Sequence, residues 1–194
     1  DWVSRWKLLE VGDLEDGKIR FKKDQGWVLS ALLERQPPTD GLTIDEPFAN
    51  LRALLSDAST PESISEPEDF IGELRPYQRE GLGWLNQLAG LGLGGCLADD
   101  MGLGKTVQIL AYFVLRANAA NAMEAAEAKA AGKPAPEERG FRRPSLVVAP
   151  RSLVFNWRAE AAKFSPKLVV VDYTGPDREH ALITSGTPDI VLTT

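Results

Sequence analysis

The chain has very few of the residues that form disulfides and metal sites. Its 194 residues include one cysteine, Cys96, and one histidine, His180. A single cysteine excludes a disulfide or a cysteine-based zinc site within the chain. We expect Cys96 to be buried in a strand, and His180 to lie at the surface because its neighbours are polar. These features are typical of a protein from a reducing cytoplasm.

Long hydrophobic runs are absent as well. No apolar stretch is long enough to span a membrane, and no secretory leader is recognisable. Hydrophobic residues nevertheless make up 43% of the chain, which is enough to build a core. The length of 194 residues suits one large domain, or one domain with an additional piece. We therefore expect a folded protein without a membrane partner.

Acidic and basic residues are unevenly distributed. Residues 1–73 carry 8 basic and 16 acidic side chains, whereas residues 74–194 carry 14 basic and 12 acidic ones, which together give the net charge of −6. Within residues 141–167 six side chains are basic and one is acidic. Such a run usually forms a solvated face, but it can also mark a nucleic-acid footprint. Charge alone leaves both interpretations open.

The chemistry is concentrated in one glycine-rich run, Ala98-Asp99-Asp100-Met101-Gly102-Leu103-Gly104-Lys105-Thr106. Phosphate groups need backbone N–H donors, and only glycine or small residues let the backbone approach closely enough. Gly102 and Gly104 would permit this approach. Lys105 would reach the β- and γ-phosphates, and the Thr106 hydroxyl would hold Mg²⁺. Asp99 stands where the usual pattern has its first glycine, so a glycine-rich turn with a chance Lys-Thr pair is the alternative.

The flanking residues favour the phosphate-binding interpretation. Residues 94–98 are predicted to form a short buried strand, and Val107, Leu110 and Val114 recur at helical spacing after the loop. A strand, a glycine loop and a helix in this order would place bound phosphates at the helix N-terminus.

The first part of the chain, residues 1–73, carries no chemical motif. We expect it to be an acidic accessory segment that ends in a linker at residues 56–69, which are rich in Ser, Pro, Glu and Asp. The predicted elements are a hairpin that pairs residues 6–11 with 18–23, and short helices at 27–33 and 48–55.

The second part, residues 74–194, alternates helices with strands. A helix beginning near Pro76 is predicted to end at Gly90 or Gly92, and the alanine- and proline-rich residues 117–144 are predicted to form a mobile surface insertion. Strands are expected at residues 146–149, 168–171 and 190–193, and helices at 153–164 and 177–183. This alternation predicts an α/β fold, with a parallel sheet flanked by helices on both faces.

Four segments, in order and at suitable spacing, resemble the motifs of Swi/Snf-type ATP-dependent DNA translocases of helicase superfamily two. Residues 99–106 resemble motif I, in which this family characteristically has an acidic residue in place of the first glycine. The other matches are Leu74-Arg75-Pro76-Tyr77-Gln78 and the residues up to Leu85 with the Q motif, Leu146 to Trp157 with motif Ia, and Ile190 to Thr194 with the start of motif Ib.

The resemblance implies a fold, an activity and partners. The fold would be the first part of a RecA-like ATP-binding lobe. The full-length protein would be a DNA-dependent ATPase that uses ATP and Mg²⁺ and acts on double-stranded DNA. Residues 1–73 look like the accessory region of bacterial members, which implies a bacterial, nucleoid-associated protein in the cytoplasm and a place for protein partners.

The resemblance also implies roles for individual residues. Gln78 would hydrogen-bond the adenine edge, because an amide both donates and accepts; otherwise it is an exposed polar helix residue. Residues 99–106 would hold the nucleotide, with Lys105 and Thr106 taking part in catalysis. Residues expected to face DNA phosphates are Arg151, Asn156, Thr193 and Thr194, although Arg151 and Asn156 could equally be ordinary surface residues.

Two elements of the family pattern are not found within these 194 residues. The acidic motif II, which would hold Mg²⁺ and orient water, should follow Thr194, and the second lobe with its arginine finger is absent too. We therefore expect the chain to be a fragment that does not hydrolyse ATP alone.

Two alternatives stay open. One is a P-loop nucleotide-binding domain of another class, such as a small-molecule kinase or a GTPase, which would not account for Gln78. The other is a non-catalytic interaction module with a vestigial loop, against which the intact Lys105 and Thr106 argue.

Overall fold

A computed structural model describes residues 13–15, 18–21, 25, 30, 43–56, 61–134, 144–175 and 187–194. The chain divides into two compact units. The first consists of residues 1–61 together with 87–94, and the second of residues 62–86 together with 95–194. The boundary expected between residues 73 and 74 therefore falls inside the second unit.

The first unit contains a hairpin and a helix. Strands β1 (Asp13–Glu15) and β2 (Lys18–Arg20) are antiparallel, with Glu15 opposite Lys18. The predicted pairing of residues 6–11 with 18–23 was wrong in its first strand, because Lys18–Arg20 pairs with Asp13–Glu15; residues 6–11 themselves lie outside the described residues. Helix α3 (Glu46–Ser56) is confirmed; Asp45 caps it by accepting a 3.1 Å bond from Phe48 N. The helix expected at 27–33 lies outside the described residues apart from Ser30.

The second unit is built on a three-stranded parallel sheet, which confirms the predicted fold class. Strands β3 (Ser145–Val148), β5 (Ile190–Thr193) and β4 (Val170–Asp172) lie in the order β3–β5–β4. Ser145 and Val170 are both in register with Ile190. The three strands therefore end at a common carboxyl edge, where ligands of such sheets bind.

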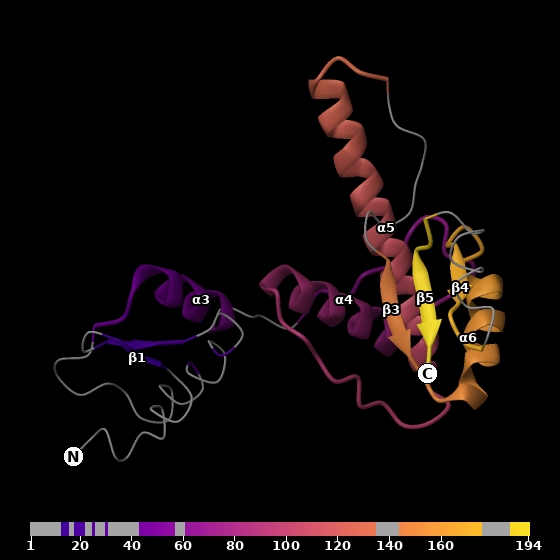
Figure 1. Ribbon diagram of the computed structural model, residues 1–194, viewed down its shortest axis with the longest axis horizontal. Helices are drawn as coiled ribbons and strands as arrows, with labels where there is room; N and C mark the ends of the chain where they lie inside the picture. The colour runs from indigo at the N-terminus through magenta and orange to yellow at the C-terminus, as the bar shows by residue number, and fades with distance from the viewer. Residues whose placement is uncertain are drawn as a thin grey trace. The chain divides into compact units, whose positions relative to one another are not determined.

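Helices cover one face of this sheet. Helix α6 (Arg151–Phe164) follows β3, and the long helix α5 (Lys105–Ala130) runs antiparallel to the strands, so that Lys105 lies toward their carboxyl ends (Figure 1). On the opposite face Leu146 and Val148 are 65% and 67% exposed. The expected helices on both faces are therefore found on one face only among the described residues; the helix expected at residues 177–183 lies outside them.

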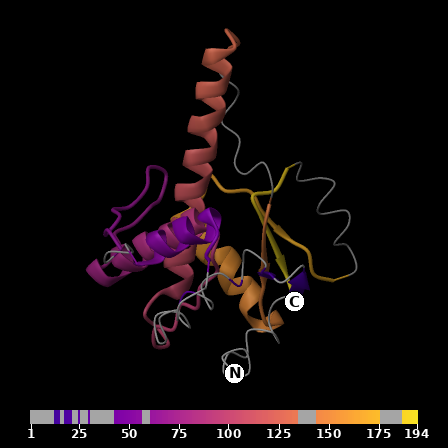
Figure 2. The same ribbon diagram turned by 90° about the vertical axis from the view of Figure 1, so that its left-hand side faces the viewer.

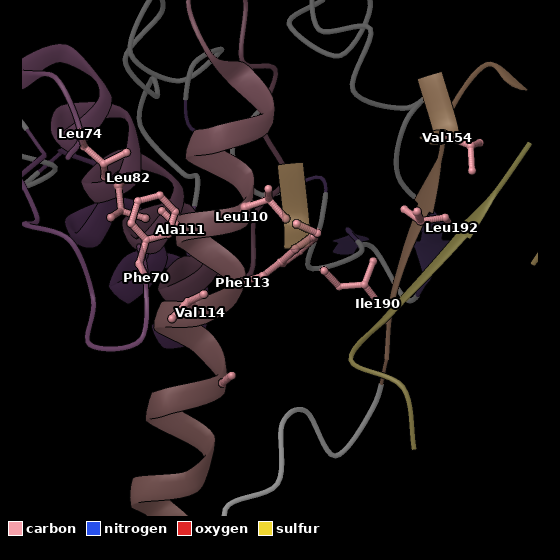
Figure 3. Close-up of a cluster of buried hydrophobic side chains, with 12 residues drawn as sticks. Phe70, Leu74, Leu82, Leu110, Ala111, Phe113, Val114, Val154, Ile190 and Leu192 are labelled. Carbon is pink, nitrogen blue, oxygen red and sulfur yellow. The ribbon is translucent and has the colours of Figure 1, made fainter. Parts of the chain in front are cut away.

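The core of the second unit surrounds the first half of α5. Leu110 and Phe113 lie between two groups of apolar side chains (Figure 3). One group comes from the segment before α4 (Pro76–Leu91) and from α4 itself; the other comes from β5 and α6. The buried members are Phe70, Leu74 and Leu82 on one side, and Ile190, Leu192, Val154 and Ala161 on the other. Packing from both sides fixes where α5 begins, and thus where the phosphate loop lies.

Residues 62–75 pack against this core, so the linker expected up to residue 69 was wrong for its final part. The rings of Phe70 and Phe164 stack at 5.9 Å, and Ile71 N donates to Phe164 O at 2.8 Å. The expectation relied on a polar composition, but within the expected linker Ile64 packs against the core and its N–H donates to Arg79 O at 3.1 Å.

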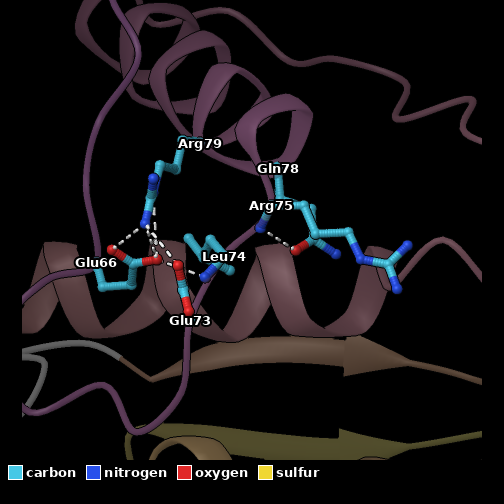
Figure 4. A network of polar contacts seen from close by, with 6 residues as sticks. All are labelled: Glu66, Glu73, Leu74, Arg75, Gln78 and Arg79. Atoms are coloured by element: carbon cyan, nitrogen blue, oxygen red, sulfur yellow. Dashed lines mark hydrogen bonds and ion pairs between the residues drawn. The ribbon is translucent and has the colours of Figure 1, made fainter.

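An ion pair ties the same segment to the start of α4. Glu66 Oε1 accepts from Arg79 Nη2 at 3.0 Å and also from Leu74 N (Figure 4). Hydrogen bonds from backbone N–H groups at Glu66 and Leu74, assisted by Arg79, hold the pKa of Glu66 below its ordinary value. The ionised carboxylate therefore fixes the N-terminal end of α4 in place.

The strand predicted at residues 94–98, before the phosphate loop, was wrong. These residues have no assigned strand, and Cys96 is exposed rather than buried. A strand forms only where a neighbouring strand satisfies its backbone groups. In the described part of the sheet, β3 and β4 are the edge strands and β5 is the only strand paired with either, so residues 94–98 have no strand partner there.

The insertion predicted at residues 117–144 begins as a continuation of α5. Residues 117–130 are helical and project beyond the end of the sheet, as two perpendicular views show (Figures 1 and 2). Ala117 is buried, and Asn118 Nδ2 donates to Glu68 O at 2.7 Å, so the first two residues belong to the core. Residues 135–143 lie outside the description. No helix among the described residues is long and apolar enough to cross a membrane.

Candidate nucleotide-binding site

The glycine-rich loop takes a conformation that only glycine adopts without strain. Gly102 and Gly104 both have positive φ, at 85° and 79°. At Gly104 space is limiting too, since a Cβ there would lie 2.6 Å from Gln78 Nε2. At Gly102 no atom would lie within 4 Å of a Cβ. Backbone conformation thus requires Gly102, whereas Gly104 is required both by conformation and by the contact with α4.

Helix α5 begins directly after the loop. Gly104 is its N-cap and makes no side-chain capping bond; the first helical turn contains no acidic residue. Gln108 N is bonded to Gly104 O at 3.1 Å, so the helical ladder starts there. The preceding N–H groups of the first turn point out of the helix end, where the helix dipole favours an anion. This end can receive phosphate oxygens.

Lys105 and Thr106 are the first two residues of α5. The ammonium of Lys105 folds back over the loop and donates to Asp99 O at 2.6 Å and to Asp100 O at 3.0 Å. Both acceptors are neutral carbonyls, so the positive charge has no acidic partner in these two bonds. Thr106 is half-buried beside it, and Met101 is 96% exposed. The sequence thus brings the ammonium, a hydroxyl and the glycine backbone together at one helix end.

Gln78 joins the start of α4 to this loop. Its Oε1 accepts from Arg75 N at 2.9 Å, as the third residue of a capping box does, and its Nε2 donates to Leu103 O at 2.9 Å. Tyr77 donates its hydroxyl to the same carbonyl at 2.9 Å. Gln78 is 7% exposed, so it is not the exposed helix residue considered as the alternative. Its predicted bond to adenine stays a prediction.

Asp99, the departure from the usual glycine pattern, has a partner. Its Oδ2 accepts from Gln108 Nε2 at 2.8 Å. Gln108 is fully buried in the second turn of α5. A carboxylate at position 99 therefore anchors the beginning of the loop to the helix that follows it.

The four residues expected to contact DNA do not behave alike. Arg151 begins α6 just after β3. Thr193 is the last residue of β5 and Thr194 follows it, so these three residues share the carboxyl edge of the sheet. Arg151 and Thr194 are exposed, whereas Thr193 Oγ1 donates to Tyr173 O at 3.4 Å. Asn156 lies in the second turn of α6, and its Nδ2 donates to Glu160 Oε1 at 3.2 Å.

A glycine loop with a lysine and a threonine at a helix N-terminus, beside a parallel sheet, is typical of the class of P-loop nucleotide-binding proteins. Within this class the chain belongs to the family of the SNF2-related domain, whose profile matches residues 77–194.

Individual relatives agree with this assignment. YwqA of Bacillus subtilis, whose name describes an ATP-dependent helicase/translocase, is 38% identical over 131 residues, which cover 66% of this chain and 12% of that protein. The chromatin-remodeling ATPase INO80 of Sclerotinia sclerotiorum is 36% identical over 142 residues, or 68% of this chain and 7% of that protein. The chain thus spans a small part of these relatives.

A solved structure is similar to part of the chain. The Sulfolobus solfataricus SWI2/SNF2 ATPase core in complex with double-stranded DNA is 34% identical, with a TM-score of 0.47. The similarity covers 70% of this chain and 23% of that one.

Sequence reasoning missed two residues of this site, Tyr77 and Gln108. Gln108 gave a signal, because it is a polar residue next to the apolar helix positions Val107 and Leu110. Tyr77 gave none beyond its place in the Q motif, since its contact with Leu103 joins residues 26 positions apart.

Proposed function

We propose that this chain is the part of an ATP-dependent double-stranded DNA translocase that holds the nucleotide phosphates. The main support is the placement of Lys105 and the loop backbone at the open N-terminus of α5. Membership of the SNF2-related family, whose relatives include proteins named as an ATP-dependent helicase/translocase and as a chromatin-remodeling ATPase, supports ATP as the ligand and motor activity as the function.

Phosphate binding would exchange the bonds of Lys105. Its ammonium now donates to two neutral carbonyls, and a triphosphate offers anionic oxygens, which form stronger charge-assisted bonds. The ammonium would therefore move from Asp99 O and Asp100 O to the β- and γ-phosphates. The N–H groups of the loop and of the first turn of α5 would hold the remaining oxygens.

The residues fit MgATP in part. Thr106 provides one hydroxyl for Mg²⁺, and the loop backbone and Lys105 provide the phosphate contacts. When bound, Mg²⁺ neutralises charge that develops on the transferring phosphoryl group. Asp99 is bonded to Gln108, so its carboxylate is directed toward the protein instead. Other magnesium-holding and water-orienting groups would come from residues beyond this segment, and the chain alone should bind ATP weakly without hydrolysing it.

Duplex DNA would lie along the carboxyl edge of the sheet and the start of α6. Arg151 and Thr194 are exposed there and are suited to phosphate contacts. Thr193 would use its hydroxyl nearby, and Asn156 would have to exchange its bond to Glu160. The setting we propose is the cytoplasm of a bacterium, at the nucleoid, with residues 1–73 available for protein partners.

The test is phosphate release by the full-length protein, with and without duplex DNA, over a range of salt concentrations. We expect stimulation by duplex DNA at low salt and loss of this stimulation as salt rises. Contacts to the DNA phosphates release bound counterions, so DNA binding weakens when the salt concentration increases. If duplex DNA failed to stimulate release even at low salt, the translocase proposal would be refuted.

A further inference from the structure

Gln108 is a polar side chain in the core of the second unit. It is 0% exposed and lies on α5 between Val107 and Ile109, one turn after the loop. Its neighbours Leu110 and Ala111 are also 0% exposed. Burying an amide among apolar groups has a cost unless its hydrogen bonds are made, so a buried glutamine calls for an explanation.

The two ends of this amide have different surroundings. Nε2 donates to Asp99 Oδ2 at 2.8 Å, whereas Oε1 has no hydrogen-bond partner among the residues that the structure describes. Oε1 points at Gly81 of α4, where an added Cβ would lie 2.1 Å from it. The absence of a side chain at Gly81 therefore makes room for the amide. Burying Gln108 leaves Oε1 unpaired, which is unfavourable, and it forms the bond from Nε2 to Asp99, which is favourable.

Asp99 is held at two points. Its carboxylate is bonded to Gln108, and its backbone carbonyl accepts from Lys105 Nζ at 2.6 Å. Under the proposed function, the ammonium leaves this carbonyl when a triphosphate binds. The bond from Gln108 is then the anchor that still holds the start of the loop to α5.

We propose that Gln108 is a positioning residue for the phosphate loop, which acts by holding the Asp99 carboxylate while Lys105 engages the triphosphate. This inference rests on the proposed function. A neutral donor suits the task, because an acidic side chain at position 108 would repel Asp99. Because the Asp99 carboxylate is bonded to a neutral amide, this bond does not engage the Lys105 ammonium.

The first experiment replaces the amide with an apolar side chain of similar length, Gln108→Met, in the full-length protein. The substitution removes the unpaired oxygen, which favours the fold, but it leaves the half-buried Asp99 carboxylate without its donor, which disfavours the fold. The two effects should largely offset each other. We expect a midpoint of thermal unfolding close to that of wild type, together with MgATP affinity lower by about tenfold, because the bond that positions the loop is lost. Wild-type affinity for MgATP in this variant would overturn the inference.

The second experiment exchanges the two groups. Gln108→Glu faces Asp99 with a second carboxylate and should weaken MgATP binding at neutral pH at least as much as Gln108→Met. In the double variant Asp99→Asn, Gln108→Glu, an amide donates to a carboxylate again in the reverse direction. We expect the double variant to recover affinity to within about threefold of wild type, since one hydrogen bond is restored.

The outcomes are distinguishable. A double variant that stays as weak as Gln108→Glu, with a normal unfolding midpoint, would show that the hydrogen bond does not position the loop and would overturn the inference. Wild-type protein that binds no MgATP would instead refute the proposed function, and the inference with it.

Discussion

The two halves of helix α5 are stabilised in different ways. Residues 105–117 contain all the buried positions of this helix, and they carry the phosphate loop at their beginning. Residues 118–130 are mostly alanine and project beyond the sheet (Figure 2). The first half is fixed by tertiary packing, whereas the second depends on the high helix propensity of alanine. Substitutions in the two halves should therefore have very different effects, although both belong to one continuous helix.

The largest difference is expected between the two lysines at opposite ends of α5. Lys105→Ala in the full-length protein should reduce ATP turnover by orders of magnitude, because it removes the charge assigned to the γ-phosphate. Lys129→Ala, the matched control in the last turn, should leave turnover unchanged. Phosphate release and thermal unfolding should be measured for both. Turnover of Lys105→Ala within about twofold of wild type would remove the loop from the mechanism.

A second contrast concerns stability. Leu110 is 0% exposed and lies at the centre of the core, whereas Met123 is 66% exposed. Leu110→Ala should lower the free energy of unfolding by about 2–5 kcal/mol, because it leaves a cavity. Met123→Ala should change it by less than about 0.5 kcal/mol. Denaturant unfolding of the two variants checks this, and equal losses would mean that the projecting half is packed as well.

A smaller effect is expected from the contact that joins α4 to the loop. Tyr77→Phe removes one hydroxyl bond to Leu103 O and leaves the bond from Gln78. If Tyr77 acts through the loop backbone, affinity should fall by about threefold to tenfold, and equally for ATP and for inorganic tripolyphosphate. A loss confined to ATP would indicate that the hydroxyl contacts the base or the ribose instead.

The smallest effect is expected from the projecting half itself. Replacing residues 119–143 with a short Gly/Ser linker retains Ala117 and Asn118, the two residues that contact the core. The midpoint of thermal unfolding should change by less than about 2 °C, because few buried contacts are lost. A drop of more than about 5 °C would show that the insertion packs on the folded unit.

Patterns that depend on neighbours in sequence were predicted well. The strand at residues 190–193 and the start of α4 at Pro76 were both confirmed. Gly92 has φ of 69°, and Leu93 N bonds Leu88 O at 2.8 Å, so glycine ends α4 as expected. These features could be predicted because Pro76 and Gly92 set the backbone conformation at their own positions.

Features that depend on distant contacts were not predicted. The apolar residues 94–98 resembled a buried strand, but strand formation requires a paired neighbour, which periodicity does not reveal. The acidic residue in the loop, Asp99, was recognised as a departure, yet its reason appears only when Gln108 is seen beside it. The same holds for Ile64, whose packing against the core makes the last part of an apparently polar linker part of the folded unit.

The central claim is that the loop before α5 binds adenine nucleotides through their phosphates, with Lys105 as the essential cation. The most direct measurement is calorimetric titration of the full-length protein and its Lys105→Ala variant with MgATP and with MgGTP, in the presence of duplex DNA. We predict that wild type binds MgATP at least about tenfold more tightly than MgGTP, and that Lys105→Ala loses most of its MgATP affinity. Equal affinity for the two nucleotides, or MgATP binding that survives Lys105→Ala unchanged, would contradict the account.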